Sequence, residues 1–421
     1  MELSLKNKSI KETVWSFLTK GATVVLFLLI NIILARRLGV ENFGLWSVFF
    51  SIITIIFAIS SGVNGSTKKF VAQYNKTKNL KNVLLSSIKL RFLLSAIFTI
   101  LVALLHRQIA NLLDNSDLAI LLLYGSPLVF FSGFVEYFKS VFMGLHRIKY
   151  NFLVNILEFG LKLILVLLFF SFSTSVFSVM NSYLIALFIT SLMGFYLLYF
   201  NFYKNLELGT RDFKKEIAQY SIPLVFIGLG VIVSTEIDTV MIGMFSDTTE
   251  VGIYAVAKQI IIKLPHVSLA IAMGTMPVFA KLNKKNKFKL KKKLYNLLKI
   301  NSILFLIIIS GILLLSPIII PFIFGSEYIS SVLPLQILTI YLFCSATSVL
   351  LSTFLDYVGK AKKRAINISF TIVLNIILNL ILIPNYGAIG AAIATSVSCL
   401  PYVLLNWLET RKILYKDSTC K

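Results

Sequence analysis

Two long apolar stretches lie between basic ends in the segment HRIKYNFLVNILEFGLKLILVLLFFSFSTSVFSVMNSYLIALFITSLMGFYLLYFNFYK (His146–Lys204). The stretches Asn151–Phe172 and Ser175–Leu198 are each long enough to cross the ~30 Å hydrocarbon layer of a bilayer at ~1.5 Å per helical residue. The short connection between them carries no Lys or Arg, whereas both outer ends do. Because short basic connections stay in the cytoplasm, this segment predicts a pair of antiparallel transmembrane helices.

The same alternation continues along the whole chain. Apolar stretches of membrane-spanning length are predicted at Glu12–Ala35, Asn42–Ser66, Val83–His106, Leu118–Phe142, Asn151–Phe172, Ser175–Leu198, Ile217–Phe245, Val251–Phe279, Leu294–Leu315, Ser331–Leu355, Ala365–Ile383 and Gly387–Trp407. Lys and Arg gather before the first stretch, after the last and in every second connection, while the other connections hold only Arg36, Arg37 and Arg107. The sequence therefore predicts an all-α integral membrane protein with twelve transmembrane helices and both termini cytoplasmic.

Composition agrees with this class. Hydrophobic residues make up 57% of the chain and the mean hydropathy is +0.86, which excludes an ordinary soluble domain at about 45–50%. The formal net charge of +23 would suggest nucleic acid in a soluble protein, but here the basic runs are short and separated. They are expected to face the anionic inner leaflet, and no nucleic-acid partner is predicted. The longest run, Lys281–Lys293, reads as an amphipathic interfacial helix or a solvated loop.

The chain divides into two halves with the same order of features. The polar connection Asn201–Lys215 leaves six predicted helices on each side, so we expect a bundle at residues 1–207 and another at 208–421. Both halves start in the cytoplasm, which predicts parallel repeats. Weak similarity joins LARRLGVENFGLWSVFFSI (Leu34–Ile52) to MIGMFSDTTEVGIYAVAKQI (Met241–Ile260), and GLHRIKY (Gly144–Tyr150) to GKAKKRA (Gly359–Ala365).

Several segments resemble one family of membrane carriers. They are LGVENFGLWSVFFSI (Leu38–Ile52), STKKFVAQY (Ser66–Tyr74), EIDTVMIGMFSDTTEVGIYAVAKQI (Glu236–Ile260), MPVFAKL (Met276–Leu282) and PNYGAIGAAIATSVS (Pro384–Ser398). In this order and spacing the chain is similar to the multidrug/oligosaccharidyl-lipid/polysaccharide (MOP) exporter superfamily, and within it to the polysaccharide-biosynthesis branch of O-antigen flippases. The resemblance implies two pseudo-symmetric six-helix bundles around a central cavity and alternating access. It carries over one position, Asp238, as a residue of structural or functional weight.

Charged residues inside the predicted helices of the first half are candidate site residues, because an ionisable group in a bilayer is costly. The positions are Lys20, Lys89, Arg91, Glu136, Glu158 and Lys162. Their depths predict one charged layer in the cytoplasmic half of the first bundle. Glu158 and Lys162 are four residues apart, so they share a helix face and can neutralise each other. The residues predicted to hold a phosphate-bearing head group are Lys20, Lys89, Arg91, Lys162 and, in the second half, Lys263.

A second set of charges lies in the second half. Asp238 and Lys258 fall at one depth on adjacent antiparallel helices, which predicts a buried ion pair. Pro265 in a long apolar run predicts a helix break and a candidate hinge, with Lys263 and His266 on one face beside it. The candidates for intramembrane pairing or ion coupling are Glu136, Glu158, Glu236, Asp238, Lys258 and His266.

No catalytic, metal-binding or cofactor-binding set is evident in the sequence. It has no GxxxxGK loop, and its three cysteines and three histidines have no metal-ligand spacing. We therefore expect a non-enzymatic flippase in the cytoplasmic membrane that exports a polyprenyl- or dolichyl-(pyro)phosphate oligosaccharide for surface glycan synthesis. Membrane lipids and glycan-assembly proteins are its expected partners. Alternatives are a cation-coupled multidrug exporter, a lipid-linked peptidoglycan-precursor flippase and, from another class, a membrane glycosyltransferase.

Overall fold

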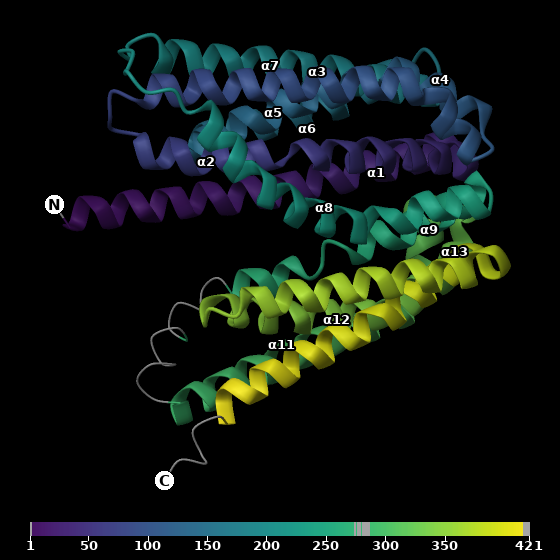
Figure 1. Cartoon of the computed structure of the whole chain (residues 1–421). Coiled ribbons are helices and arrows are strands. Elements are labelled where there is room, and N and C mark those ends of the chain that lie inside the picture. The colour runs from purple at the N-terminus through teal and green to yellow at the C-terminus, as the bar shows by residue number, and fades with distance from the viewer. Residues whose placement is uncertain (1, 273–274, 276–278, 280–286, 416–421) are drawn as a thin grey trace. The chain divides into compact units, whose positions relative to one another are not determined.

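The computed structural model describes residues 2–272, 275, 279 and 287–415 of the chain (Figure 1). Regular structure in these ranges is entirely helical. The first elements are α1 (Glu2–Ser60), α2 (Gly62–Tyr74), α3 (Leu80–Leu112), α4 (Ser116–Gly125), α5 (Pro127–Gly144), α6 (Ile148–Phe170), α7 (Val176–Leu198) and the π-helical turn η1 (Tyr199–Tyr203). The later ones are α8 (Lys214–Phe245), α9 (Thr248–Ile261), α11 (Lys287–Phe324), the 3₁₀ turn η2 (Ser326–Ser331), α12 (Val332–Tyr357) and α13 (Ala361–Tyr415).

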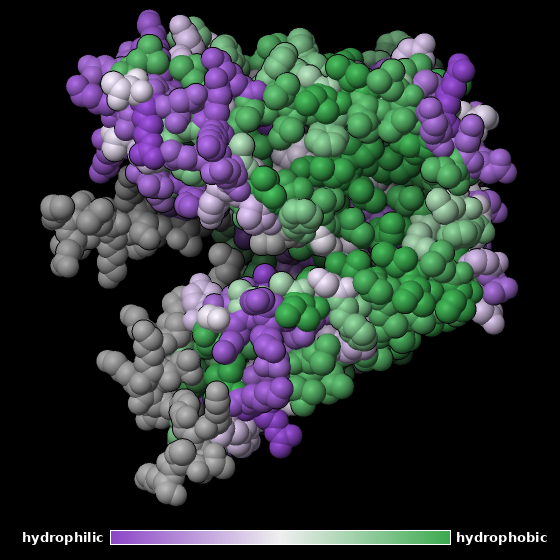
Figure 2. Space-filling view, in the orientation of Figure 1, coloured by the Kyte–Doolittle hydropathy of each residue, from purple (hydrophilic) through white to green (hydrophobic). Residues whose placement is uncertain are grey.

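These helices have the length and surface of membrane spans. Within the described ranges nine helices are long and apolar enough to cross a membrane, and ten if α4 and α5, bent by 45°, form one span. Many large apolar side chains are exposed on them, and Figure 2 shows hydrophobic side chains along the helices with hydrophilic ones gathered toward their ends. Lipid solvates such a surface, so the chain is a multi-pass membrane protein.

Two pairs of predicted spans are continuous elements in the structure. α1 contains the predicted stretch Glu12–Ala35 and most of Asn42–Ser66, and its helical geometry is interrupted at Gly39 (φ 75°, ψ 172°). α13 contains the last two predicted stretches and is interrupted at Gly387 (φ 50°, ψ −127°). Glycine adopts positive φ without the steric cost of a Cβ, so each long element turns at its glycine.

Packing divides the chain into two compact units, unit 1 (Met1–Glu236) and unit 2 (Ile237–Lys421). In unit 1, α5 packs against α2, α3, α6 and α7, and α1 packs against α6. In unit 2, α12 contacts α9, α11 and α13. The centres of the two units are therefore α5 and α12.

The boundary between the units lies inside α8, later than the predicted division at residues 207 and 208. The first part of α8 belongs to unit 1 because Ser221 shares a 2.8 Å hydrogen bond with Ser66. Close approach of α2 assists this packing, since a Cβ on Gly62 would lie 2.6 Å from Cγ2 of Val225. Nearer the boundary, Ser51 donates to Glu236 at 2.8 Å. The six-and-six division remains a prediction about repeats.

Some predicted connections are helical. The basic segment after the second span continues as helix α2 up to Tyr74, and α11 begins at Lys287 and runs to Phe324 instead of ending at Leu315. The described part of the basic run Lys281–Lys293 is therefore the start of a long helix, and residues 280–286 lie outside the described residues. A basic helix end costs little, because long Lys side chains reach the aqueous interface.

Candidate functional site

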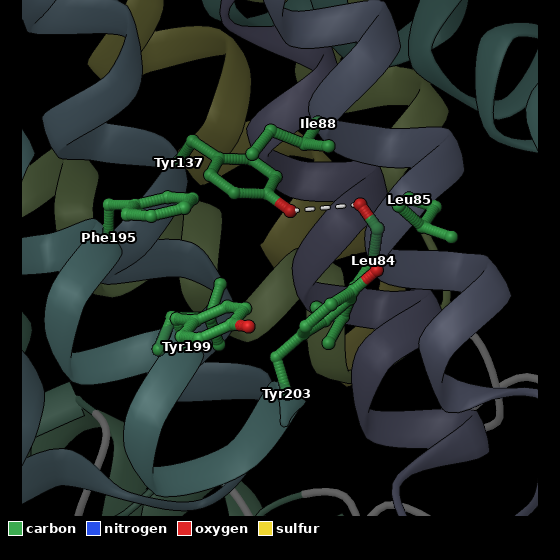
Figure 3. Close-up of a pocket in the computed structure, with 8 residues that line it drawn as sticks. Leu84, Leu85, Ile88, Tyr137, Phe195, Tyr199 and Tyr203 are labelled. Atoms are coloured by element: carbon green, nitrogen blue, oxygen red, sulfur yellow. Dashed lines mark hydrogen bonds between the residues drawn. The ribbon is translucent and has the colours of Figure 1, made fainter. Parts of the chain in front are cut away.

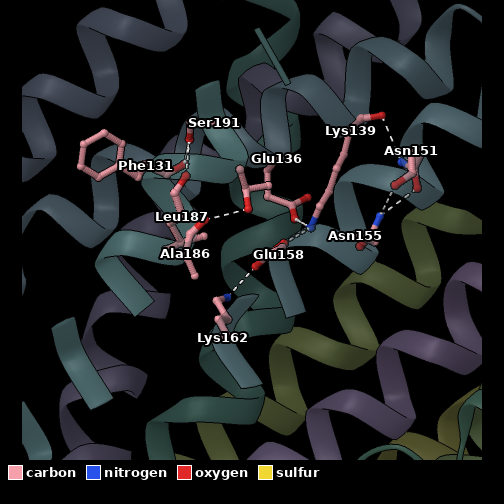
Figure 4. A network of polar contacts seen from close by, with 11 residues as sticks. Phe131, Glu136, Lys139, Asn151, Asn155, Glu158, Lys162, Ala186, Leu187 and Ser191 are labelled. Atoms are coloured by element: carbon pink, nitrogen blue, oxygen red, sulfur yellow. Dashed lines mark hydrogen bonds and ion pairs between the residues drawn. The ribbon is translucent and has the colours of Figure 1, made fainter. Parts of the chain in front are cut away.

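Four charged residues in unit 1 form a continuous chain of ion pairs (Figure 4). The carboxylate of Glu158 accepts from Lys139 (Nζ–Oε2 2.6 Å) and from Lys162 (Nζ–Oε1 2.5 Å). Lys139 also donates to Glu136 (Nζ–Oε1 2.7 Å). The order Glu136–Lys139–Glu158–Lys162 alternates in sign and is called the charged chain below.

Helix spacing positions these groups. Glu136 and Lys139 are separated by three residues on α5, and Glu158 and Lys162 by four on α6, so each pair shares a face. Asn151 holds the two helices in register, and Asn155 supports it from within α6. Asn151 Nδ2 donates to the backbone carbonyl of Lys139 at 3.2 Å, and Asn155 Nδ2 donates to the Asn151 carbonyl at 2.8 Å.

The charged chain is buried at three of its four positions. The side chains of Lys139, Glu158 and Lys162 are 7–9% exposed, whereas that of Glu136 is 44% exposed. Two carboxylates and two ammonium groups sum to zero charge. Neutrality is expected, because an unpaired charge would lose its hydration without compensation in the bilayer. Glu136 is the group that solvent or a small solute reaches first.

A cavity of about 220 Å³ opens against one side of the charged chain. Its lining combines aromatic, aliphatic and charged side chains: Phe27, Phe50, Ile53, Thr54, Phe57, Leu128, Ser132, Val135, Glu136, Glu158, Phe159, Lys162, Tyr183 and Leu187. The ammonium of Lys162 lies 5.0 Å from the ring centroid of Phe159 and 4.8 Å from that of Tyr183. Apolar walls with a few convergent polar groups are typical of ligand sites.

Arg91 lies behind this cavity and not in its lining. Its side chain is fully buried, with Nη1 donating to the Ser60 carbonyl at 2.9 Å and Nη2 donating to Ser60 Oγ at 3.1 Å. The guanidinium also lies over the ring of Phe57 at 5.3 Å, and a Cβ on Gly133 would be 2.6 Å from Cζ. In this arrangement Arg91 bridges helices, and no head group can reach it.

The structure brings together only part of the predicted charged layer. Glu136, Glu158 and Lys162 meet at the cavity, and the predicted Glu158–Lys162 pair forms. Lys20 is exposed on α1 and is not among the residues that line this cavity. Lys89 lines a different pocket, together with residues 208–214. The layer is thus not a single cationic surface, since the helix rotation of α1 and α3 turns these lysines away.

Asp238 in unit 2 is the centre of a buried polar cluster. It is 2% exposed and accepts from three neutral side chains: Tyr254 (2.8 Å), Thr395 (2.6 Å) and Asn379 (2.6 Å). The predicted Asp238–Lys258 ion pair is wrong, because Tyr254, one helical turn before Lys258, occupies the position opposite Asp238. Lys258 donates instead to Thr239 at 2.8 Å. The cluster ties α8, α9 and α13 together.

The helical segment that begins with α9 is interrupted at Pro265, where the sequence predicts a break. α9 ends at Ile261, and residues 262–265 form turns before helical geometry resumes at His266. His266 is exposed and Lys263 half-buried, and both take part in further interactions. Pro265 itself is buried, and its role as a hinge remains a prediction.

Three residues of these sites were not predicted from the sequence, and Lys139 is the one in the charged chain. It joins the two carboxylates of the charged chain, and the only signal for it was its spacing of three from Glu136. Asn379 and Thr395 were missed too, because they contact Asp238 across more than a hundred residues. Among the described residues no group of three His, Cys, Asp or Glu could hold a metal ion.

Comparison with known proteins gives the family. The family model described as polysaccharide biosynthesis protein matches residues 9–283, which is more than half of the chain, and the MatE model matches residues 223–381. An uncharacterised membrane protein of Methanocaldococcus jannaschii is 26% identical over 417 residues, covering 96% of this chain and 97% of that protein. A probable low-salt glycan biosynthesis flippase of Haloferax volcanii, Agl15, is 29% identical over 162 residues, 38% of this chain and 34% of that protein.

Solved structures share the fold. An inward-facing multidrug resistance MATE transporter of the MOP superfamily superposes with a TM-score of 0.80 at 18% identity, over 94% of this chain and 96% of its own. The lipid II flippase MurJ in an inward closed conformation gives 0.77 at 20% identity, over 97% and 89%. The chain therefore belongs to the polysaccharide biosynthesis protein family, and it shares the fold of the MATE transporter of the MOP superfamily and of MurJ.

Proposed function

We propose that the protein flips a lipid-linked oligosaccharide across the cytoplasmic membrane by alternating access, as a non-enzymatic step of surface glycan synthesis. The observation that carries this is the cavity of unit 1, where ion-paired side chains lie beside aromatic walls. Moving a head group with many hydroxyls through hydrocarbon is prohibitive unless protein groups replace its hydration. Carboxylates and ammonium groups supply hydrogen-bond partners for sugar hydroxyls, and the family match supports the glycan.

Binding of a phosphate in this cavity would work by exchange of partners. In the structure Lys162 is neutralised by Glu158 at 2.5 Å, so it is not a free cation. Glu158 has a second partner, Lys139, at 2.6 Å. An entering phosphate can therefore take Lys162 while Glu158 keeps Lys139, and no buried charge is left unpaired. Of the first-half residues predicted to bind the phosphate, Lys162 is the one that lines this cavity. Arg91 is enclosed, and Lys20 and Lys89 do not line the cavity.

The proposal includes the topology read from the sequence. We propose twelve spans in two six-helix repeats, residues 1–207 and 208–421, with both termini cytoplasmic. The breaks at Gly39 and Gly387 support this count, because each divides a long element into two helices of spanning length. The bent pair α4 and α5 would act as one further span. Glycan-assembly proteins remain proposed partners.

A cation-coupled exporter of small molecules is the second candidate. The charged chain has no net charge, and it includes an acid at the cavity, Glu136, whose side chain is 44% exposed. An accessible acid favours a cation-coupled exporter more than a purely cationic layer would. Such an acid can exchange a proton or a sodium ion. The MatE match over residues 223–381 supports the same reading.

The two candidates differ in what the protein moves across a sealed vesicle. The full chain is reconstituted with a fluorescent lipid-linked oligosaccharide, and a membrane-impermeant glycosidase outside reports its arrival. Lys162→Ala should slow arrival about ten- to a hundredfold, because a hydrogen bond to a charged group contributes ~1.5–3 kcal/mol. Lys162→Arg should retain most of the rate, and Lys20→Ala is the control at an exposed lysine.

Two results would contradict the proposal. One is wild-type arrival of the oligosaccharide with Lys162→Ala. The other is transport of a cationic dye against a proton gradient by vesicles that leave the oligosaccharide inside, which would establish the cation-coupled exporter.

A further inference from the structure

A second pocket on unit 1 is apolar and shares no lining residue with the cavity at the charged chain (Figure 3). It has a volume of about 300 Å³. Its lining includes Leu84 and Ile88 of α3 and four aromatic side chains, Tyr137, Phe195, Tyr199 and Tyr203. Figure 3 shows the rings around one space, and the Tyr137 hydroxyl is already bonded to the Leu84 carbonyl at 3.1 Å. This pocket, called the aromatic slot, suits a hydrocarbon chain.

The slot owes its shape to a π-helical turn. Beyond α7 the backbone forms η1 over Tyr199–Tyr203, which widens the helix and stacks the Tyr199 and Tyr203 rings at 5.9 Å. Such turns are rare and are frequently found at functional sites. Tyr and Trp side chains also favour the level where lipid head groups meet hydrocarbon. The aromatic side chains of the turn are therefore of the kind that contacts the glycerol region of a lipid.

A polar pocket of about 240 Å³ adjoins the slot, and Leu85 lines both. Three cationic side chains, Lys89, Arg211 and Lys214, line it against one carboxylate, Asp212. Arg211 is paired with Glu216 at 2.6 Å, and Lys214 forms a longer ion pair with Asp212 at 3.8 Å. Lys89 is exposed and makes no ion pair within the part of the chain that the structure describes. This pocket, called the cationic cup, has a net positive lining.

The cup is held in shape by the loop that follows η1. Asn82 Nδ2 donates to the carbonyls of Gly209 (2.8 Å) and Arg211 (2.9 Å), and its Oδ1 accepts from Gly209 N at 3.1 Å. Asp212 accepts from Lys214 N at 3.1 Å and from Ser86 Oγ at 3.0 Å. Both bonds lower the pKa of the Asp212 carboxyl, and the bond from Lys214 N has the larger effect. Asp212 therefore stays ionised at neutral pH. The loop is thus anchored on α3 before any ligand arrives.

We propose that the aromatic slot and the cationic cup together bind one anionic phospholipid, with an acyl chain in the slot and the phosphate between Lys89 and Lys214. Charge complementarity selects the occupant: the cup is net positive, and the leaflet on the side of the basic connections is anionic. The slot and the cup meet at Leu85, which lines both. This favours a lipid over a free phosphate, because a free phosphate would leave the apolar slot unfilled.

Lipid counting on the purified full chain tests this. The protein is titrated with phosphatidylglycerol or phosphatidylcholine, and native mass spectrometry counts the bound lipids. Wild type should keep one phosphatidylglycerol in preference to phosphatidylcholine. Removing two cations with Lys89→Gln/Lys214→Gln should weaken that binding by about 25-fold, or about fivefold for each. Filling the slot with Ile88→Trp should abolish it while leaving the cup charges in place.

Matched controls separate the site from general lipid attraction. Lys292→Gln removes an exposed cation on α11, and Leu104→Trp adds the same bulk to α3 at a residue 70% exposed. Both should keep the lipid, and thermal unfolding checks that every variant is folded. The proposal is overturned if the site variants retain phosphatidylglycerol like the controls or if phosphatidylcholine binds equally well. An effect of the cup variants without one of Ile88→Trp would also overturn it, since that result means a phosphate site without a lipid tail.

Discussion

Replacing Lys139 by Met removes the central cation of the charged chain and keeps a side chain of similar length. Glu158 then loses a 2.6 Å bond but keeps Lys162 at 2.5 Å. A hydrogen bond to a charged group contributes ~1.5–3 kcal/mol. The second bond of Lys139 goes to Glu136, whose 44% exposure limits its share to below ~1 kcal/mol. We therefore expect Lys139→Met to lower the free energy of unfolding by about 2–4 kcal/mol.

Reversible unfolding of the full chain in mixed lipid–detergent micelles measures this loss. A double-mutant cycle with Glu158→Gln isolates the pair, because removing both partners avoids leaving one charge buried alone. The double variant should lose about 1.5 kcal/mol less than the two single losses combined. Lys20→Met serves as the control at an exposed lysine and should stay within about 0.5 kcal/mol of wild type. Equal losses for Lys139→Met and Lys20→Met, or strictly additive losses in the cycle, would refute the reasoning.

Two glycine substitutions probe the close contacts of the fold by thermal unfolding. Gly133→Ala should lower the free energy of unfolding by about 1–3 kcal/mol, because its Cβ would lie 2.6 Å from Cζ of the enclosed Arg91. Gly160→Ala is the control and should be neutral or stabilising, because a Cβ there would meet nothing within 4 Å. Equal effects of the two substitutions would contradict this reasoning. Gly387→Ala should cost more than the ~1–2 kcal/mol of its positive φ, because its Cβ would lie 2.8 Å from Cδ of Glu250. In a Glu250→Ala background only the backbone part should remain, and an unchanged penalty there would rule out the steric contribution.

Predictions from sequence succeeded where the interacting residues are neighbours along the chain. The Glu158–Lys162 pair follows from a spacing of four on one helix, and it forms. The proline predicted the break before His266 for an equally local reason. α12 begins and ends within two residues of the predicted stretch Ser331–Leu355, since its apolar run has clear polar limits.

Predictions failed where the partner comes from another helix. The sequence predicts Lys258 as the partner of Asp238, yet the bonds of Asp238 come from Tyr254, Asn379 and Thr395. Which face a residue presents depends on helix rotation, and an apolar membrane helix reveals little of its rotation. Its lipid-facing and protein-facing sides are both hydrophobic, so the periodicity that marks the buried face of a soluble helix is weak.

Apolar run length and the placement of Lys and Arg were sufficient to determine the class of the protein, a helical multi-pass membrane protein. Its family was indicated by the resemblance of segments such as Glu236–Ile260 and Pro384–Ser398. A bilayer imposes these constraints on each segment separately, so they are readable without knowing any contact. Tertiary structure decided which charges meet: it enclosed Arg91 against Ser60, turned Lys89 toward a separate pocket and inserted Lys139 between two acids. The physical reason is that an ion pair depends on helix rotation and crossing, which only packing among the helices determines.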